Sequence, residues 1–325
     1  MDAEPSVDSG MPTGTFDAVI VGGGPAGLSA AVSLGRACRS VVVFDCARPS
    51  RSDWAQTNHN YLGFPDGVSI RELTDRGRRQ AERFGACFRS SEVTDLARDG
   101  EMFVIRTPGE TYRARAVVLA TGVTDRWPEF PDYEDYIGRS LPWCLVCDGF
   151  EMRGQRVLVV GDDDHAAEMA AQLTRFAARV ALLTNADRPA LSEAAHGSLR
   201  RHGIEVVVDR LVGARPKALG EFVAALLAGG GEIETDHVSG AQGAVPNADL
   251  ARALGVTLTD DGYIKVDTEA KTSVPGVYAA GDVTRLFSHQ VATAVHEGAT
   301  AAAALSHALF EQDEAQERTQ SMCRR

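Results

Sequence analysis

The chain has 325 residues, of which 44% are hydrophobic and 32 are glycine, so it is long enough for two hydrophobic cores joined by many tight turns. A formal net charge of -12 argues against a nucleic-acid partner, because phosphate contacts need clustered Lys and Arg. The polar, acidic start is not a secretory signal, and no apolar run approaches the roughly 18 residues of a membrane helix. We therefore expect a cytoplasmic protein without a membrane partner, beginning with a disordered leader at residues 1–15.

Order is expected to begin at Phe16, where the sequence predicts a strand, a glycine turn, a helix and a second strand. The turn has the pattern G-x-G-x-x-G at Gly22, Gly24 and Gly27, with Pro25 and Ala26 inside it. In this context the glycines allow a tight turn, close approach of a pyrophosphate to the backbone, and close packing of helix on strand. Asp45 follows the second strand, where an acidic residue accepts a hydrogen bond from an adenosine ribose. The motif predicts a dinucleotide site, but by itself does not distinguish FAD from NAD.

Further along the chain, residues 69–84 are predicted to form a surface helix with Ser69 as its cap. A buried strand then ends in the tripeptide Ala120, Thr121 and Gly122. Such a small-residue strand end lets the ribityl chain of a flavin pass close to the backbone. It favours a flavin at the first motif.

The segment "WCLVCDGF" contains the two cysteines that form a motif, Cys144 and Cys147, followed by Asp148. Cysteines at this spacing close a small redox disulfide, and Asp148 is placed to exchange a proton with a thiol. A structural disulfide or inert thiols are the alternatives. A zinc site would need a second pair of ligands that the sequence lacks, so no metal is expected.

A second strand, helix and strand are predicted from Arg156, with the turn "GDDDHA" from Gly161 to Ala166. A helix at 192–201, a strand at 204–209, strand-like pieces at 222–227 and around Ile233, and a glycine-rich linker follow.

The chain then returns with strands in "GYIKVD" and "PGVYAAGD", where Gly281 and Asp282 are placed to contact flavin hydroxyls. A long small-residue helix opens at Gln290 and Val291, where its N-terminus can stabilise negative charge on the reduced flavin.

These elements predict an α/β fold with two Rossmann-like, three-layer ββα nucleotide-binding domains, the second inserted in the first. We expect an FAD-binding domain at 16–123 and 247–310, a redox-disulfide domain with a degenerate NAD(P)H fold at 124–246, and a flexible, frayed tail at 311–325.

The order of these motifs over residues 16–308 resembles the low-molecular-weight thioredoxin reductase family. The resemblance implies FAD in the first domain, a homodimer, and a redox disulfide that exchanges electrons with the flavin and with a thioredoxin-like protein. Carried onto this chain, it makes Cys147 the flavin-facing cysteine, Cys144 the one that attacks the partner, and Asp148 the acid-base group. It also assigns Asn60 to FAD binding.

The turn "GDDDHA" departs from that family. Members that use NADPH have a G-x-G-x-x-A turn here and a basic pair after the next strand, whereas this chain has Asp162, Asp163 and Asp164, and later Asp187. A carboxylate about 5 Å from a phosphate charge costs on the order of 3 kcal/mol at an effective dielectric near 20. We interpret these aspartates as the cap and first turn of a helix. Their carboxylates then accept from the backbone N–H groups that a pyrophosphate would otherwise use.

NADPH is therefore doubtful as a cofactor, and the sequence resembles the branch that lacks NADPH motifs, including deeply rooted and ferredoxin-dependent thioredoxin reductases. The main hypothesis is a reductase whose electron donor is unknown, with ferredoxin one possibility. The alternatives are a dithiol oxidase that uses oxygen, an NADPH-dependent enzyme with an unconventional site, and a redox sensor without steady turnover.

Overall fold

The computed structural model describes residues 14–46, 51, 54, 57–143 and 145–323, with only the backbone at 321–323. The chain divides into two compact units. Unit 1 comprises residues 1–48, 73–123 and 246–325, and unit 2 comprises residues 49–72 and 124–245. Residues 49–72 group with unit 2, whereas the sequence predicts them in the FAD-binding domain. The predicted leader lies outside the described residues up to Thr13, and the first strand begins at Thr15, inside the leader's expected bounds.

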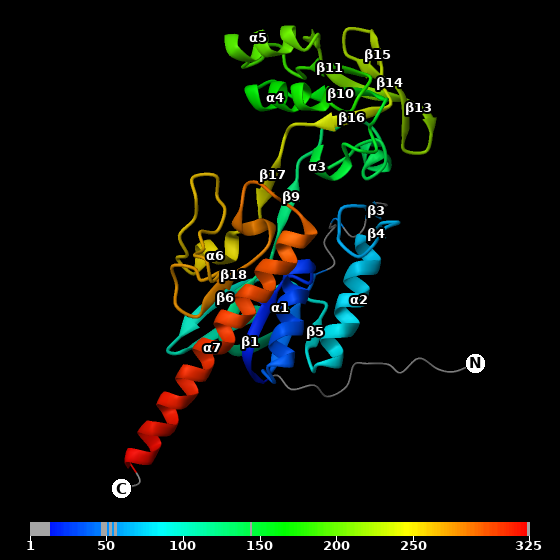
Figure 1. Ribbon diagram of the computed structural model, residues 1–325. Coiled ribbons are helices and arrows are strands. Elements are labelled where there is room, and N and C mark those ends of the chain that lie inside the picture. The colour runs from blue at the N-terminus through cyan, green and yellow to red at the C-terminus, as the bar shows by residue number, and fades with distance from the viewer. Residues whose placement is uncertain (1–13, 47–50, 52–53, 55–56, 144, 324–325) are drawn as a thin grey trace, which may run out of the picture. The chain divides into compact units, whose positions relative to one another are not determined.

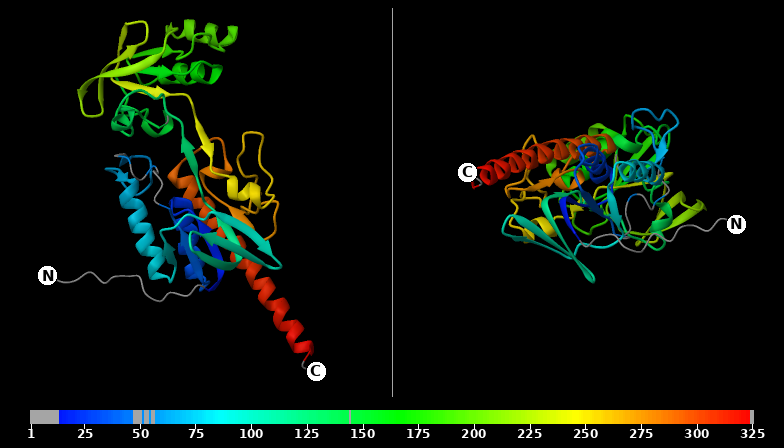
Figure 2. Two further views of the ribbon diagram at one scale, coloured as in Figure 1. Left: turned by 180° about the vertical axis from the view of Figure 1, so that it is seen from behind. Right: turned by 90° about the horizontal axis from the view of Figure 1, so that it is seen from below.

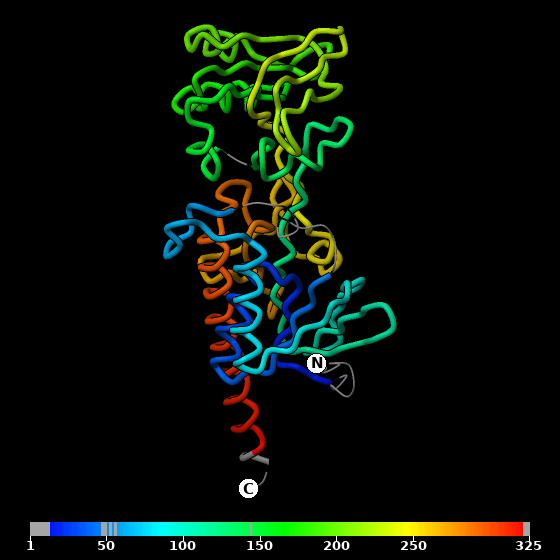
Figure 3. Tube along the Cα trace, turned by 90° about the vertical axis from the view of Figure 1, so that its right-hand side faces the viewer, coloured from blue at the N-terminus to red at the C-terminus, as the bar shows by residue number. Residues whose placement is uncertain are grey.

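Unit 1 is built on a sheet with the strand order β5-β2-β1-β8-β7-β6, to which β18 adds by pairing with β8 (Figure 1). Its strands are β1 (Thr15–Val21), β2 (Val41–Phe44), β5 (Cys87–Arg89), β6 (Asp95–Asp99), β7 (Met102–Thr107), β8 (Glu110–Leu119) and β18 (Val277–Ala279). Strands β1, β2, β5, β8 and β18 pair in parallel, whereas β6 and β7 pair antiparallel, visible as teal hairpins in Figure 3. The parallel strands end together at one edge of the sheet.

The helices of unit 1 are α1 (Pro25–Arg36), α2 (Ile70–Arg83, with its first three residues in unit 2), α6 (Asp249–Ala253) and α7 (Val291–Cys323). Helices α1 and α7 lie side by side (Figure 2). They approach closely because the contact is made by small residues: a Cβ added at Gly298 would lie 2.0 Å from the carbonyl oxygen of Ala26. Ser69 caps α2 as predicted, since its Oγ accepts from the amide of Glu72.

The C-terminal tail differs from the sequence prediction. Helix α7 does not fray at Glu311 but continues to Cys323, and its last turns project beyond the sheet (Figure 1). Asp313 explains part of this continuation, because its carboxylate pairs with Arg39 at 2.8 Å and with Arg115 at 2.6 Å. The two arginines tie the helix to the end of the sheet.

Unit 2 contains a parallel sheet with the order β12-β11-β10-β16 and an antiparallel sheet with the order β13-β14-β15. The parallel strands are β10 (Arg156–Val160), β11 (Arg179–Leu183), β12 (Glu205–Val207) and β16 (His237–Gly240), and the antiparallel strands are β13 (Leu211–Ala218), β14 (Glu221–Leu227) and β15 (Glu232–Glu234). Short strand pairs are formed by β3 (Thr57–Asn58) with β4 (Val68–Ser69), and by β9 (Val123–Asp125) with β17 (Ala244–Pro246).

The helices of unit 2 are α3 (Leu145–Asp148), α4 (Asp164–Leu173) and α5 (Glu193–Arg201). Strand β10 is buried on both faces: Val157 and Val159 pack in one core with residues of α4 and α5, and Leu158 and Val160 pack in another with residues of the antiparallel sheet. This arrangement is typical of a Rossmann-like layer structure. The predicted α/β fold with two Rossmann-like units is confirmed. In the part of the chain that the structure describes, no helix is long and apolar enough to cross a bilayer.

Candidate dinucleotide and disulfide sites

In the turn between β1 and α1, each motif glycine is explained by a different feature of its surroundings. Gly22 has a φ of +111°, and an added Cβ would lie 2.2 Å from the carbonyl oxygen of Ala120. At Gly27 an added Cβ would lie 1.9 Å from the carbonyl oxygen of Gly22, so only glycine lets α1 start this close to the strand. Pro25 and Ala26 form the first turn of α1.

Gly24 differs from its two neighbours in the motif, because an added Cβ would meet nothing within 4 Å. Gly24 is the N-cap of α1, and among the described residues no side chain caps the amides there. The helix N-terminus therefore carries no capping side chain and has open space at its N-cap, as a pyrophosphate site requires. This part of unit 1 fits a dinucleotide.

Asp45 directly follows β2 and lies beside the same turn. The amide of Gly23 donates to its Oδ1 at 3.2 Å, and a Cβ at Gly23 would lie 2.4 Å from its Oδ2. The neighbouring strands therefore bring Asp45 and the glycine turn together.

The tripeptide at the end of β8 lies next to the end of β18, because Leu119 pairs with Ala279. Thr121 is held by Asn247: its Oγ1 donates to the Asn247 carbonyl at 2.6 Å, and its own carbonyl accepts from Asn247 Nδ2 at 3.0 Å. Gly122 has a φ of +64° and open space around its Cβ position. The sequence does not indicate this role of Asn247, because its partner Thr121 lies 126 positions earlier.

Gly281 and Asp282 follow β18, and the amide of Gly281 donates to Glu297 Oε2 at 2.7 Å. Glu297 is 8% exposed and also pairs with Arg285, so a buried carboxylate fixes this turn. Helix α7 begins at Val291, and the Gln290 carbonyl accepts its first helical bond from Ala294. Glu297 also escaped the sequence analysis; the signal was a charged residue inside a small-residue helix.

All but one of the predicted cofactor residues therefore belong to unit 1, at the carboxyl edge of its parallel strands, where nucleotides bind in open α/β sheets. The exception is Asn60, which belongs to unit 2. The residues present in unit 1 fit an FAD.

The Cys-x-x-Cys segment lies in unit 2. Cys147 is in the four-residue helix α3 and is disulfide-bonded, and Cys144 lies outside the described residues. Asp148 ends α3, and its Oδ2 accepts from the backbone amide of Trp143 at 2.9 Å. The indole Nε1 of Trp143 donates to Asp125 Oδ2 at 2.9 Å.

The turn between β10 and α4 is bonded by the three aspartates, two through side chains and one through its carbonyl. Asp163 is the N-cap, and its Oδ1 accepts from the amide of Ala166 at 2.9 Å, so the predicted cap is confirmed. Asp164 Oδ1 accepts from the amide of Ser192 at 2.8 Å, and this backbone hydrogen bond lowers the pKa of the carboxyl from 3.8. The carbonyl of Asp162 accepts from the amide of Ala190 at 2.6 Å.

These last two bonds fasten the segment after β11 to the turn. We call residues 185–192 the strap. In the strap, Asp187 forms an exposed ion pair with Arg210, which lowers the pKa of the Asp187 carboxyl. An acid therefore stands near the position where NADPH-binding relatives are expected to have a basic pair.

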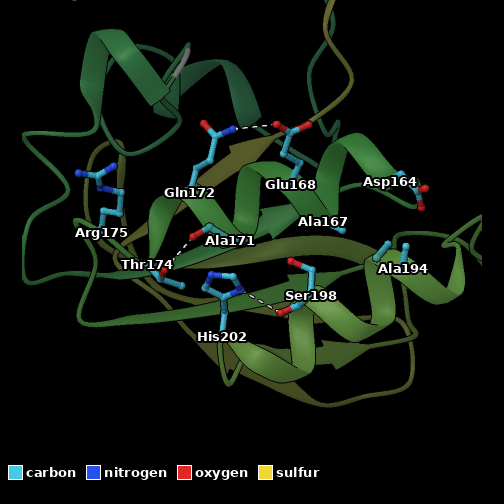
Figure 4. Close-up of a pocket in the computed structure, with 11 residues that line it drawn as sticks. Asp164, Ala167, Glu168, Ala171, Gln172, Thr174, Arg175, Ala194, Ser198 and His202 are labelled. Atoms are coloured by element: carbon cyan, nitrogen blue, oxygen red, sulfur yellow. Dashed lines mark hydrogen bonds between the residues drawn. The ribbon is translucent and has the colours of Figure 1, made fainter.

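A groove of about 480 Å³ lies between α4 and α5 (Figure 4). Two of its polar side chains pair with each other on α4, where Gln172 donates to Glu168 at 3.1 Å, and His202 bonds to the carbonyl of Ser198. Among the described residues, no group of three or more His, Cys, Asp or Glu side chains is placed to hold a metal ion.

Comparison with known proteins agrees with this geometry. Residues 16–299 match the pyridine nucleotide-disulphide oxidoreductase family. A thioredoxin reductase of Mycolicibacterium smegmatis is 34% identical over 304 residues, covering 91% of this chain and 97% of that protein. Among solved structures, HlmI is 30% identical with a TM-score of 0.88, covering 95% of this chain and 96% of its own. A thioredoxin reductase of Streptococcus pyogenes is 27% identical with a TM-score of 0.85, covering 91% of this chain and 99% of its own.

The family match spans most of the chain, and the fold, the open glycine turn and the disulfide-bonded Cys147 agree with it. The chain belongs to the thioredoxin reductase family of pyridine nucleotide-disulphide oxidoreductases and is an FAD-dependent disulfide oxidoreductase.

Proposed function

We propose that this protein passes electrons between FAD and a Cys144–Cys147 disulfide, and on to a thioredoxin-like protein, without taking hydride directly from NADPH. Two sets of residues carry the proposal: the open turn of unit 1 and the filled turn of unit 2. The relatives named thioredoxin reductase support the class of partner.

In unit 1, FAD would supply two-electron redox chemistry, held by the residues at the carboxyl edge of the sheet. The amides after Gly24 would bind its pyrophosphate, and Asp45 would accept from its adenosine ribose. Asp282 would accept from ribityl hydroxyls, and the start of α7 at Gln290 and Val291 would face the flavin ring.

In unit 2, the chemistry of the cysteines is thiol-disulfide exchange. The Cys144 thiolate attacks one sulfur of the partner disulfide, which forms a mixed disulfide and releases one partner thiolate. The Cys147 thiolate then attacks Cys144, which re-forms the Cys144–Cys147 bond and releases the second partner thiolate. Asp148, next to Cys147, gives a proton to a departing thiolate or takes one from an attacking thiol. The reverse sequence oxidises a dithiol partner.

The proposal that NADPH is not the direct electron donor rests on the hydrogen bonds made by the turn at Asp162–Asp164. The Asp163 carboxylate takes an amide of α4 that a pyrophosphate would need, and the strap is bonded across the turn through Ala190 and Ser192. Two carboxylates at this helix N-terminus also repel a dinucleotide phosphate. A donor other than a nicotinamide, such as reduced ferredoxin, would then deliver the electrons.

The proposal includes a homodimer and a cytoplasmic location, and the resemblance to the thioredoxin reductase family supports the homodimer.

The test is anaerobic reduction of the holoenzyme followed in a stopped-flow instrument by the loss of oxidised-flavin absorbance. We expect no fast bleaching with NADPH or NADH, and bleaching with reduced ferredoxin or with a dithiol. Fast bleaching by NADPH would contradict the NADPH-independent part. Bleaching by a dithiol followed by rapid reoxidation by oxygen, with none by ferredoxin, would assign the oxidase direction instead.

The cysteines need a matched control. A Cys147→Ser variant keeps the flavin site intact, so it should accept electrons from reduced ferredoxin but fail to exchange them with a dithiol. Dithiol reduction of the flavin at the wild-type rate in this variant would contradict the assigned disulfide.

A further inference from the structure

Asp125, at the end of β9, is the centre of a cluster of three side chains from three segments of unit 2. The guanidinium of Arg51 holds its carboxylate with two bonds, from Nε to Oδ2 at 2.9 Å and from a terminal nitrogen to Oδ1 at 2.6 Å. The indole of Trp143 donates to the same Oδ2 at 2.9 Å. Arg51, Asp125 and Trp143 are called the Asp125 cluster.

The cluster is partly buried. The side chains of Asp125 and Arg51 are 16% and 28% exposed, and the ring of Trp143 packs edge-on against Trp127 with centroids 5.4 Å apart. A carboxylate removed from water needs compensation, and the two-pronged pair with Arg51 provides it. The bond to the indole is then made to a fixed, charged acceptor, which orients it more strongly than a neutral one would.

Trp143 connects the cluster to the redox segment. It directly precedes Cys144, and its backbone amide donates to Asp148, which directly follows Cys147. The residues on both sides of the Cys-x-x-Cys motif are thus joined to each other, and the indole joins them to Asp125. A packing role alone would require only that the indole N–H find some acceptor.

Asp125 and Arg51 come from segments of the chain that are remote in sequence from the cysteines. Strand β9 is the connection by which the chain enters unit 2, between Val123 and Thr124. Arg51 comes from the separate segment at 49–72. Two segments remote in sequence from the cysteines therefore hold the residue that precedes the first of them.

We propose that Asp125 is a positioning residue for thiol-disulfide exchange, acting through the indole of Trp143 to hold the redox segment in its reactive geometry. The inference rests on the proposed function of Cys144 and Cys147. The reaction itself is unchanged, with one S–S bond forming as another breaks. Misplacing a reacting group by about 1 Å costs up to about a hundredfold in rate.

The experiment measures attack by Cys144 alone. In a Cys147→Ser holoenzyme, reaction with oxidised glutathione leaves a mixed disulfide on Cys144 that Cys147 cannot resolve, and peptide mass spectrometry measures its rate of formation. Cys38, which is exposed and lies in unit 1, is the internal reference in every sample.

Adding Asp125→Ala should slow modification of Cys144 at least about tenfold relative to Cys38. Trp143→Phe, which keeps a ring but removes the donor, should slow it by a similar factor, and the two together should be no slower than either alone. Asp125→Asn keeps an acceptor for the indole and should recover most of the rate.

Asp236→Ala is the matched control, because Asp236 also forms a two-pronged pair with an arginine of unit 2, Arg156. It should lower the melting temperature without slowing Cys144. An unchanged rate in Asp125→Ala, additive effects of the two substitutions, or equal slowing in Asp236→Ala would overturn the inference and leave the proposed function standing. If Cys144 in the parent reacts no faster than Cys38, the proposed function itself fails, and the inference falls with it.

Discussion

Units 1 and 2 each contain a strand, a glycine turn and a helix, and they differ in the residue at the N-cap of that helix. In unit 1 the N-cap of α1 is Gly24, which has open space beside it and no side chain on the helix amides. In unit 2 the N-cap of α4 is Asp163, whose carboxylate bonds to the helix, and the strap is fastened across the turn.

The comparison separates what a fold needs from what a ligand needs. Close packing requires glycine in both turns: a Cβ at Gly27 would lie 1.9 Å from a carbonyl oxygen, and one at Gly161 would lie 2.7 Å from Ala166 Cβ. The cap position is under no such constraint, because either glycine or aspartate can start a helix. A nucleotide site can therefore be lost while the layer that carried it remains stable.

The largest expected effect comes from giving the N-cap of α1 in unit 1 the aspartate that caps α4 in unit 2. Gly24→Asp should fold, since its backbone is extended and nothing lies within 4 Å of the added Cβ, but should place a carboxylate beside the FAD pyrophosphate. At about 3 kcal/mol, the repulsion should weaken FAD binding more than a hundredfold. Titration of apoprotein with FAD, followed by flavin fluorescence, measures it.

Gly24→Ala is the control for that substitution, because it adds the same Cβ without charge and should retain most of the affinity. Tight FAD binding by Gly24→Asp would show that the open turn of unit 1 is not the pyrophosphate site.

A smaller effect is expected at the cap of α4. Asp163→Ala removes the bond to the Ala166 amide and should destabilise the first turn by about 1 kcal/mol, which is about fivefold faster hydrogen exchange at that amide. Asp163→Ser retains a capping oxygen without the charge and should exchange at nearly the wild-type rate. Unaltered exchange in Asp163→Ala would mean that the aspartate does not cap the helix in solution.

The smallest effect is a pH dependence of the strap. The amide of Ser192 lowers the pKa of Asp164 below 3.8, so this bond stabilises the folded state above that pH, and its contribution is lost as the pH falls through the lowered pKa. Protection of the Ser192 amide, corrected for intrinsic exchange, should therefore fall in acid, and Asp164→Asn should remove the pH dependence. The Ala190 amide bonds to a carbonyl and is the reference that does not titrate. A parallel loss of protection at both amides would point to general unfolding instead.

The sequence predicted the elements whose patterns are local. The run at Val41–Phe44 is a buried strand as expected, and Asp163 caps α4, because burial runs and capping residues act within one turn or strand. The predicted strand in "GYIKVD" forms only an isolated bridge at Ile264, and strand β13, which contains Pro216, escaped prediction. A proline and three register irregularities obscure the alternation of that strand.

The contacts that complete the candidate sites join residues that lie far apart in the sequence. The strap is bonded to the turn across 28 positions, from Ser192 to Asp164, and Arg51 reaches Asp125 across 74. No pattern within a sequence window predicts such pairs, because each partner alone is a common polar residue. The continuation of α7 was missed for the same reason, since Asp313 is bound by Arg39 and Arg115 from distant segments.

The central proposal is that unit 1 binds a dinucleotide and that unit 2 does not. Calorimetric titration of the holoenzyme with NADP⁺ tests it directly, with titration of apoprotein by FAD as the positive control. The account predicts tight binding of FAD and no saturable heat from NADP⁺ up to millimolar concentrations. Saturable micromolar binding of NADP⁺, abolished by a substitution in the strap or the Asp162–Asp164 turn, would contradict it.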